Sequence, residues 1–271
     1  MPELPEVQCV VNSIKDKIEN KKIKKIVRFS KNLREPLSND LFKLENSTVK
    51  KIIRRGKYII ITLESNKDFY LIVHLGMTGS LLFKEKNQKK EKHDHLKIEF
   101  ENFDLIYNDI RKFGFVIIDD SLKDNKYIKK LGVDPLKNSF ENGEFLFKSS
   151  RDKNRDVKVF LLDQSIVAGI GNIYIMEALF LTKLNPKIKV KDLTFIECVN
   201  LSKTLVFLLE ESIKLGGSSI SDYKDADNKK GSFQDKFLIY GKKTCSICLS
   251  EVEKIKQNGR STYFCPVCQK L

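Results

Sequence analysis

Four of the six cysteines form two Cys-x-x-Cys pairs near the C-terminal end of the sequence, namely Cys245 with Cys248 and Cys265 with Cys268. The second pair begins 17 positions after Cys248, a spacing typical of two β-hairpin knuckles that close one tetrahedral, four-thiolate zinc site. Such a site has no open coordination position, so its zinc is structural. Free thiols or disulfides are the alternative interpretation. The isolated Cys9 and Cys198 are expected to be small buried residues.

The first six residues, Met1-Pro2-Glu3-Leu4-Pro5-Glu6, place a proline and two glutamates at the expected start of a helix. A small residue follows Met1, so we expect Met1 to be removed, which exposes the secondary amine of Pro2. An α-amino group has a pKa of about 7.7 to 8, and the positive end of a helix lowers it, so this amine can attack carbonyl-like carbons. Glu3 and Glu6 can then move protons. The alternative is that these are ordinary first-turn residues of a helix.

The sequence has 271 residues, enough for two domains, and it carries 50 Lys and Arg against 36 Asp and Glu, a net charge of +14. This excess favours a polyanionic partner, nucleic acid first, although a general lysine bias of the source proteome explains part of it equally well. No apolar run approaches the about 20 residues of a membrane span, and no signal segment precedes the first helix. We therefore expect a soluble, cytoplasmic protein without membrane contact.

The order of periodic segments predicts an α+β chain. Apolar residues recur at helical spacing over 6–20. Short β-rich runs then indicate an antiparallel sandwich or barrel, over 23–29, 49–63, 69–75, 96–100, 105–107 and 115–118. Helical spacing returns over 157–162, 173–181 and 193–215. We expect a domain over 1–130, a linker over 131–149, a helical domain over 150–236 and a cysteine-bearing tail over 237–271.

Two glycine-flanked loops in the β-rich part present large apolar residues, Met77 within 74–79 and Phe113 within 108–114. Wedges of this kind insert between stacked bases, and the neighbouring Arg111 can hydrogen-bond to an orphaned base. Burial in a core is the commoner fate of Met and Phe, so both interpretations stay open.

Other segments are candidates for polar contacts. The turn Gly169-Ile170-Gly171-Asn172 precedes a helix and can bring backbone N–H groups close to a phosphate, although tight helix packing explains the glycines as well. Arg260 and Thr262 stand just before Cys265 and either donate to a phosphate or lie at a solvated hairpin tip. The alternation His93-Asp94-His95 favours a polar network within a strand over a metal site.

Together these motifs resemble the formamidopyrimidine-DNA glycosylase family of bacterial base-excision repair enzymes, and the likeness covers nearly the whole chain. The matching segments, in order, are Pro2-Glu3-Leu4-Pro5-Glu6-Val7, Arg54-Arg55-Gly56-Lys57-Tyr58, His74-Leu75-Gly76-Met77, Lys92-His93-Asp94-His95, Asn108-Asp109, Arg111-Lys112-Phe113-Gly114, Leu162-Asp163-Gln164, the run from Ala168 to Tyr174, and Phe264-Cys265-Pro266-x-Cys268-Gln269. The resemblance implies an N-terminal helix with an antiparallel β-sandwich, then a helix-two-turn-helix domain ending in a zinc finger. It also implies a monomer that binds damaged double-stranded DNA in the cleft between the domains.

The resemblance further implies roles for individual residues. Pro2 attacks C1′ of the damaged nucleoside, Glu3 is the acid/base group, and Lys57 and Arg260 support catalysis while holding phosphate. The implied DNA contacts are His74, Met77, Arg111, Phe113, Lys158 and Asn172. The polar segment 216–232 corresponds to the family's lesion-capping loop. The implied activity is that of a glycosylase and abasic-site lyase acting on 8-oxoguanine and formamidopyrimidines.

Two other functions remain possible from the sequence. The related endonuclease VIII branch takes oxidised pyrimidines but usually has glycine where Leu4 stands here. A zinc-bearing, non-catalytic DNA-binding protein would keep the scaffold but not the chemistry. Some positions depart from the family pattern: Val11 and Asn12 replace frequent arginines, and Ile110 replaces a proline. The run Asp227-Asn228-Lys229-Lys230-Gly231 carries an extra lysine in place of a proline. These departures bear on DNA affinity and lesion preference rather than on the reaction.

Overall fold

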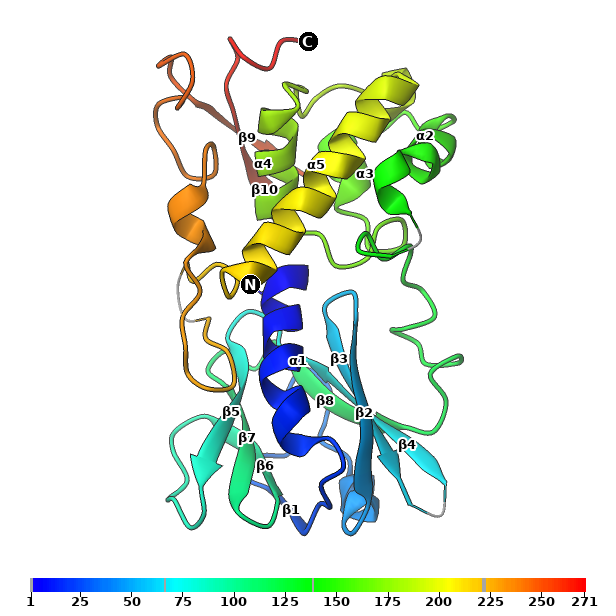
Figure 1. The fold of residues 1–271 in the computed structure, drawn as a ribbon, viewed down its shortest axis with the longest axis vertical. Helices are drawn as coiled ribbons and strands as arrows, with labels where there is room; N and C mark the ends of the chain where they lie inside the picture. The colour runs from blue at the N-terminus through cyan, green and yellow to red at the C-terminus, as the bar shows by residue number, and fades with distance from the viewer. Residues whose placement is uncertain (1, 66, 138, 221–222) are drawn as a thin grey trace. The chain divides into compact units, whose positions relative to one another are not determined.

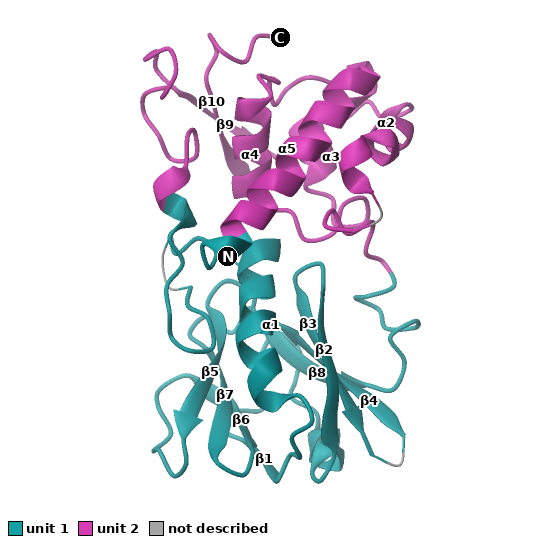
Figure 2. Cartoon of the chain, viewed as in Figure 1, with its two compact units in different colours: residues 1–129, 213–234 teal, residues 130–212, 235–271 magenta. Residues whose placement is uncertain are grey.

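The computed structural model describes residues 2–65, 67–137, 139–220 and 223–271. The chain forms two compact units, one made of residues 1–129 and 213–234 and the other of residues 130–212 and 235–271 (Figure 2). Each unit is thus built from two stretches of sequence. Met1, and residues 221 and 222 of the expected lesion-capping loop, lie outside the described residues.

The first unit combines one long helix with two antiparallel sheets. The helix α1 is Leu4–Ile18, and the short 3-10 helix η1 is Asn39–Leu44. One sheet has the order β1-β6-β7-β5, with strands Lys25–Arg28, Asp94–Glu99, Phe103–Asp109 and Gly79–Glu85. The other has the order β2-β3-β4-β8, with strands Thr48–Arg55, Tyr58–Glu64, Asp68–His74 and Phe115–Asp119 (Figure 1). These elements confirm the predicted mixture of helices and antiparallel sheets.

The core of this unit follows from the periodicities of its sequence. Alternate residues of both sheets enter one cluster, such as Ile26 and Ile98 from the first sheet and Ile61 and Val73 from the second. The apolar stripe of α1, predicted from helical spacing, packs into the same cluster. Two features differ from the expected strands. The run 49–63 folds as the hairpin β2–β3 because Gly56 reverses the chain with φ 58°, and β5 was not anticipated.

The second unit is mainly helical and ends in a small hairpin. Its helices are α2 (Glu144–Ser150), α3 (Val157–Leu161), α4 (Asn172–Leu181) and α5 (Phe195–Lys214), whose last two residues belong to the first unit. Short 3-10 helices lie at Phe140–Asn142, Val190–Asp192 and Phe233–Lys236, the last shared between the units. The hairpin pairs β9 (Glu253–Gln257) with β10 (Arg260–Phe264). The helix α4 is buried on nearly every side, so it forms the centre of this unit.

Among the residues that the structure describes, no helix combines the length and the apolar character that a membrane span requires.

Candidate nucleic-acid interface and zinc site

The N-terminal residues Pro2 and Glu3 are buried where α1 begins. Glu3 is the N-cap residue, and its backbone N–H donates to the Glu6 carboxylate (N to Oε2, 2.8 Å). The positive end of the helix therefore lies at Pro2, and it favours nearby negative charge and the neutral form of an amine. Removal of Met1 would thus place a basic amine next in sequence to a carboxylate at the start of α1.

Lys57 lies in the two-residue turn between β2 and β3 and is largely buried. The preceding Arg54 is buried and fastens this turn, because its Nη1 donates to the Gly56 carbonyl (3.1 Å) and its Nε donates to Gln8 of α1 (3.0 Å). The hairpin tip is therefore attached to the same helix that begins at Glu3. This attachment positions the Lys57 stem relative to α1.

His74 ends β4 in a neutral state. Burial, with the positive charges of Lys57 and Arg34, lowers the pKa of His74 to about 4. Its Nδ1 accepts the Gly76 backbone N–H (3.1 Å), so the proton of the neutral ring is on Nε2, which is left as a donor. The ring stacks on Phe115 with centroids 5.3 Å apart. His74 can therefore offer one oriented N–H to an anion without carrying charge.

Replacing His74 with Asn should flatten the pH dependence of stability. A His with a pKa near 4 when folded and 6.5 when unfolded contributes stability that is present above pH 6.5 and lost as the pH falls to 4. The full contribution is about 3 kcal/mol. Asn keeps an acceptor near the Nδ1 position but does not titrate. The free energy of unfolding, measured with urea between pH 4 and 7, should change less steeply with pH in His74→Asn than in the wild type. Equal slopes for the two proteins would contradict the assignment.

The loop residues Met77 and Phe113 are exposed by 39% and 45%. They line a pocket of about 420 Å³ together with Arg34, His74 and Gly76. The guanidinium of Arg111 lies over the Phe113 ring, 4.6 Å from its centroid. Met77 and Phe113 are therefore not core residues, and their exposure is compatible with side chains that insert between stacked bases.

Asp109 holds the two loops together. It is fully buried, and its carboxylate accepts hydrogen bonds from Thr78 Oγ1 (2.6 Å), the Arg111 N–H (3.2 Å) and the Gly114 N–H (2.8 Å). Its backbone carbonyl lies 2.8 Å from His95 Nε2, in the polar strand network that the sequence suggested. Gly76 allows the loops to touch, since a Cβ there would lie 2.4 Å from the Gly114 nitrogen.

We expect Asp109→Asn to loosen both loops. Asparagine has one carbonyl oxygen, so an NH₂ group must replace one of the two accepting oxygens of Asp109 and face N–H or O–H donors. Leaving buried donors unsatisfied costs about 1–3 kcal/mol. Thermal unfolding should report that loss, and DNA affinity should fall with it, whereas Asp119→Asn, in the same unit, should retain affinity. An Asp109→Asn protein with unchanged stability and affinity would exclude this role.

In the second unit, Lys158, Asn172 and the β10 strand come together. Lys158 is fully buried, and its Nζ donates to Thr262 Oγ1 (2.7 Å). Burial and the nearby charge of Arg260 lower the pKa of Lys158 to about 8. Asn172, the first residue of α4, donates from Nδ2 to the Ser261 carbonyl (2.9 Å). The sequence candidates Lys158, Asn172 and Arg260 therefore lie together around β10, where Lys158 and Arg260 supply positive charge and Asn172 a neutral amide.

The four cysteines of the two Cys-x-x-Cys pairs converge on one zinc site. Their Sγ atoms all lie within 4.8 Å of one another, with 3.8 Å between Cys245 and Cys268 and 3.5 Å between Cys248 and Cys265. Four thiolates around a tetrahedral zinc with bonds of about 2.3 Å lie about 3.8 Å apart, so the donor set fits the ion. Backbone N–H groups of Ile247 and Cys268 also point at sulfur atoms (3.4 Å each).

Two buried side chains attach the zinc-binding segment to the helices of the second unit. Gln269 accepts the Cys265 N–H (2.9 Å) and donates to the Leu184 carbonyl (2.8 Å). Glu177 of α4 accepts three successive backbone N–H groups, those of residues 238, 239 and 240, at 2.8 to 3.1 Å. Burial raises the pKa of Glu177, which these hydrogen bonds oppose. The zinc site is thus anchored at both ends of its segment.

Sequence reasoning did not assign site roles to Asp109, Arg34, Glu177 or Gln269. Asp109 and Gln269 stand inside segments that carried the family resemblance, which is the one signal that could have pointed to them. Arg34 stands alone in a polar stretch, and its place in the pocket with Met77 and Phe113 depends on tertiary structure.

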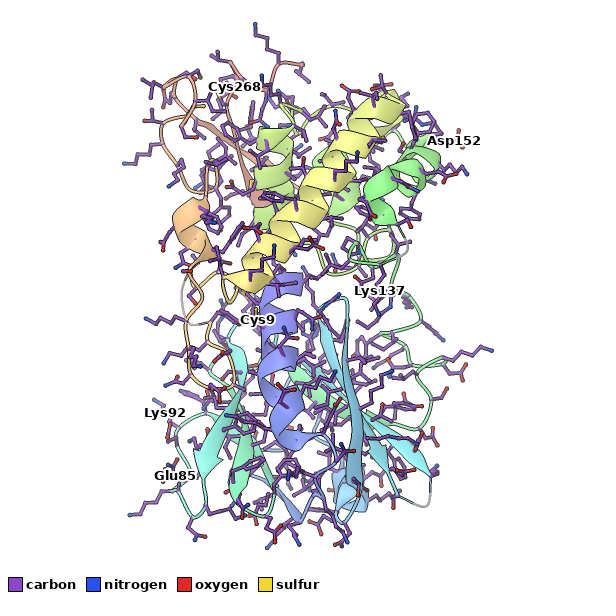
Figure 3. The ribbon with its side chains drawn as sticks, viewed as in Figure 1. Cys9, Glu85, Lys92, Lys137, Asp152 and Cys268 are labelled. Carbon is purple, nitrogen blue, oxygen red and sulfur yellow. The ribbon has the colours of Figure 1, made fainter. Side chains whose placement is uncertain are left out.

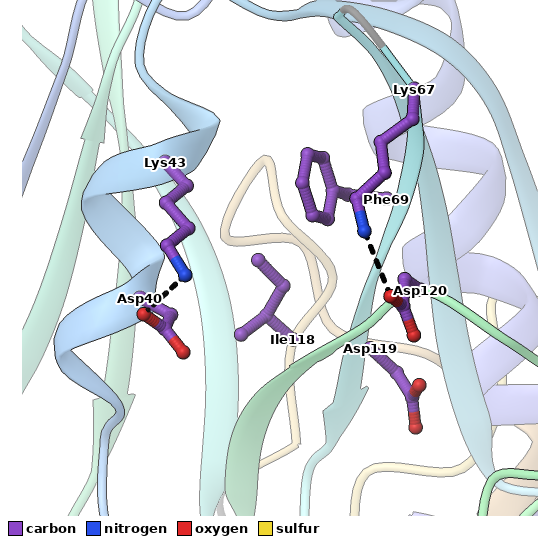
Figure 4. A pocket seen from close by; sticks show the side chains of 7 residues that line it. All are labelled: Asp40, Lys43, Lys67, Phe69, Ile118, Asp119 and Asp120. Carbon is purple, nitrogen blue, oxygen red and sulfur yellow. Dashed lines mark hydrogen bonds and ion pairs between the residues drawn. The ribbon is translucent and has the colours of Figure 1, made fainter.

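A separate pocket of about 330 Å³ in the first unit lies among η1, β4 and β8 (Figure 4). Its lysines pair with its own acidic residues, Lys43 with Asp40 and Lys67 with Asp120, at 2.8 Å each. Because these charges are already matched and exposed, we assign it no ligand.

The chain matches three sequence patterns of one enzyme family: the formamidopyrimidine-DNA glycosylase N-terminal domain over residues 1–116, the formamidopyrimidine-DNA glycosylase H2TH domain over 131–224, and a zinc finger found in FPG and IleRS over 242–271. It is 40% identical to the formamidopyrimidine-DNA glycosylase of Wolbachia pipientis subsp. Culex pipiens, over 99% of this chain and 100% of that protein. The Haemophilus influenzae (strain PittEE) protein of the same name is 38% identical, over 100% of this chain and 99% of that protein. A Lactococcus lactis FPG mutant, crystallised with DNA containing Fapy-dG, is 37% identical, covers both chains fully and superimposes with a TM-score of 0.90. The Lactococcus lactis Fpg crystallised with DNA containing an abasic site is 36% identical. The match covers 99% of this chain and 100% of that chain, also with a TM-score of 0.90. The chain belongs to the formamidopyrimidine-DNA glycosylase family.

Proposed function

We propose that this protein is a DNA glycosylase of base-excision repair that removes oxidised purines, 8-oxoguanine and formamidopyrimidines, and then cleaves the abasic site. The observation that carries the proposal is the buried start of α1, where Pro2 and the N-cap residue Glu3 lie together at the positive end of the helix. A helix end lowers the pKa of an amine, and a neighbouring carboxylate supplies the proton transfers that amine chemistry needs. Family membership makes damaged DNA the expected substrate.

The reaction follows from nucleophilic catalysis. Once Met1 is removed, the Pro2 nitrogen attacks C1′, the bond from C1′ to the base breaks, and the base leaves with the electron pair and gains a proton from water. The attacking nitrogen then gives its N–H proton to the Glu3 carboxylate. Glu3 protonates the sugar ring oxygen as the ring opens, which leaves an iminium ion between Pro2 and C1′. Loss of a C2′ proton then expels the 3′ phosphate, and a second elimination expels the 5′ phosphate. Hydrolysis of the iminium finally releases the sugar fragment and restores the amine.

We assign the remaining site residues two roles, filling the gap that the extruded nucleotide leaves in the duplex and contacting the phosphates. A glycosylase must flip its target out of the duplex and fill the gap, which is the role we assign to Met77, Arg111 and Phe113. Support comes from their exposure and from the Asp109 hydrogen bonds that position their loops. We assign phosphate contacts to Lys57, His74, Asn172 and Arg260, with Lys158 as a further basic group. Within the first unit, the neutral His74 and the cationic Lys57 would each donate to phosphate oxygens.

The lesion class can be tested on defined duplexes. Matched oligonucleotides would carry 8-oxoguanine, a formamidopyrimidine, an oxidised pyrimidine or undamaged guanine, each opposite cytosine except the pyrimidine lesion, which is placed opposite guanine. We expect base release and strand cleavage to be fastest on the two purine lesions and absent on the undamaged duplex. A preference for the oxidised pyrimidine would instead favour the endonuclease VIII type of specificity, and binding without cleavage of any duplex would favour the non-catalytic alternative.

A further inference from the structure

The described residues of the segment 213–234 are fastened along α1 within the first unit (Figure 1). Near the end of the helix, Lys17 forms an ion pair with Asp227, and in the middle Ser13 Oγ accepts the Ala226 N–H (3.2 Å). Cys9, which points from α1 in Figure 3, lies with its Sγ 3.6 Å from the Ile213 carbonyl. Burial and the Glu6 charge raise the pKa of Cys9 to about 12, so its thiol remains a donor.

The contact nearest the N-terminus involves a single carboxylate with two partners. Glu6 Oε2 accepts the Glu3 N–H (2.8 Å), while Glu6 Oε1 accepts both the N–H and the hydroxyl of Ser218 (2.8 and 2.9 Å). The Glu6 side chain is 2% exposed, and the Tyr223 hydroxyl donates to the Glu6 carbonyl (3.0 Å). One side chain therefore joins the backbone that carries Pro2 to a segment more than 200 residues later in sequence.

We propose that Glu6 is a positioning residue that couples the seating of the segment 213–234 on α1 to the placement of the Pro2 amine and Glu3. The inference rests on the proposed function for its catalytic readout. When Ser218 is seated, both Glu6 oxygens are held, and the Glu3 N–H is fixed at the helix start. When the segment leaves, one oxygen loses two donors, and the carboxylate is free to rotate away from Glu3. The amine is then aligned only while the segment is in place.

The chemistry of glutamine makes this coupling testable. A Gln side chain has one accepting oxygen and one NH₂ group, so in Glu6→Gln no rotamer accepts from both Glu3 and Ser218. Gly217 offers a second test from the other side of the contact. Gly217 has φ +85°, and a Cβ added there would lie 3.1 Å from Glu6 Cγ, 3.2 Å from Glu6 Oε1 and 3.1 Å from Cε1 of Tyr223, whose hydroxyl also donates to the Glu6 carbonyl. At Gly216, φ is +78°, but the nearest atom to a Cβ is at an ordinary 3.4 Å. Gly216→Ala and Gly217→Ala should therefore cause similar backbone strain, but only the Cβ of Gly217→Ala would press against the Glu6 side chain.

The experiment uses duplex DNA with a preformed abasic site, because this substrate has no damaged base for the segment to recognise. The rate of covalent trapping with borohydride then reports the amine and Glu3 alone. We expect Glu6→Gln to slow trapping about tenfold, since hydrogen bonds to a charged group are lost. Ser218→Ala removes only the hydroxyl and keeps the backbone N–H that also donates to Glu6, so it should slow trapping by a smaller factor. The double variant should slow trapping by less than the product of the two single effects, because both changes act on one contact. Gly217→Ala should slow trapping more than Gly216→Ala.

Glu19→Gln is the matched control, since Glu19 at the other end of α1 also accepts a backbone N–H, that of Ile52 (2.9 Å); its trapping rate should be unchanged. Wild-type trapping by Ser218→Ala, or multiplicative slowing in the double variant, would overturn the coupling. If the wild-type protein traps no covalent adduct, the proposed function fails. Hydrogen exchange of the N-terminal peptide, measured without DNA, then still tests whether the contact between Ser218 and Glu6 holds the Glu3 N–H in place. Faster exchange at Glu3 in Ser218→Ala supports it, and unchanged exchange refutes it.

Discussion

Pro2→Gly should lower the rate of base release from an 8-oxoguanine duplex by about a hundredfold or more. The nitrogen of an N-terminal proline is a secondary amine held in a rigid ring, so its attack leads directly to an iminium ion. Glycine provides a primary amine on a flexible residue, and a loss of positioning of this kind costs large factors in rate. Single-turnover kinetics with borohydride trapping measure both base release and the covalent intermediate.

Glu3→Gln in the same assay should nearly abolish base release, because general acid–base catalysis contributes about 10²–10⁴-fold. The helix should survive, since the Glu6 carboxylate accepts the Glu3 backbone N–H, and a Gln side chain keeps one oxygen that can accept the Glu6 backbone N–H as the Glu3 side chain does. Binding to a duplex with an uncleavable abasic analogue should therefore remain near the wild-type level. Loss of this binding together with activity would show a folding defect instead.

Trapping that persists undiminished in both variants would remove Pro2 and Glu3 from the mechanism. The intact mass provides an independent check, since a retained Met1 would convert the Pro2 nitrogen into a non-nucleophilic amide. The mass of the active protein should correspond to a chain without Met1.

Cys245→Ser should remove the zinc and, with it, most of the DNA affinity. Structural zinc sites contribute about 10–16 kcal/mol of binding free energy that is also folding free energy, so loss of one thiolate loosens the whole knuckle pair. The hairpin β9–β10 follows the first knuckle directly and carries Arg260 and Thr262. Without zinc, Arg260 is no longer fixed, and the Thr262 hydroxyl is no longer held against Lys158. We expect DNA affinity to fall about tenfold or more, the equivalent of about 1.4 kcal/mol.

Metal analysis and fluorescence anisotropy on the same preparations measure the two effects. Cys198→Ala is the matched control, because Cys198 is a buried cysteine of the same unit outside the cluster, and this variant should keep one zinc and its DNA affinity. Stoichiometric zinc in Cys245→Ser would exclude the four-thiolate site. Zinc loss with unchanged affinity would mean that the hairpin does not contact DNA.

The sequence predicted what depends on short-range pattern. Helical spacing located α1 near its observed bounds, and Cys-x-x-Cys spacing identified the zinc ligands, because a knuckle and a helical turn each involve only neighbouring residues. The same local logic missed the break in the run 49–63, since a single glycine changes the chain direction without changing the apolar pattern. It also missed β5, whose alternation is weak.

What the sequence by itself determined, then, is the family, the mixed α and β architecture, the zinc ligands and the candidate residues at the N-terminus. Only the tertiary structure decided which distant groups share a hydrogen bond. Asp109 joins two loops about 30 residues apart, and Glu6 joins the helix start to Ser218. No periodicity encodes such pairs, because a buried carboxylate selects its donors only after both segments have folded against the same core. The start of α1 is therefore readable in the sequence, while the contacts that position it are visible only in the fold.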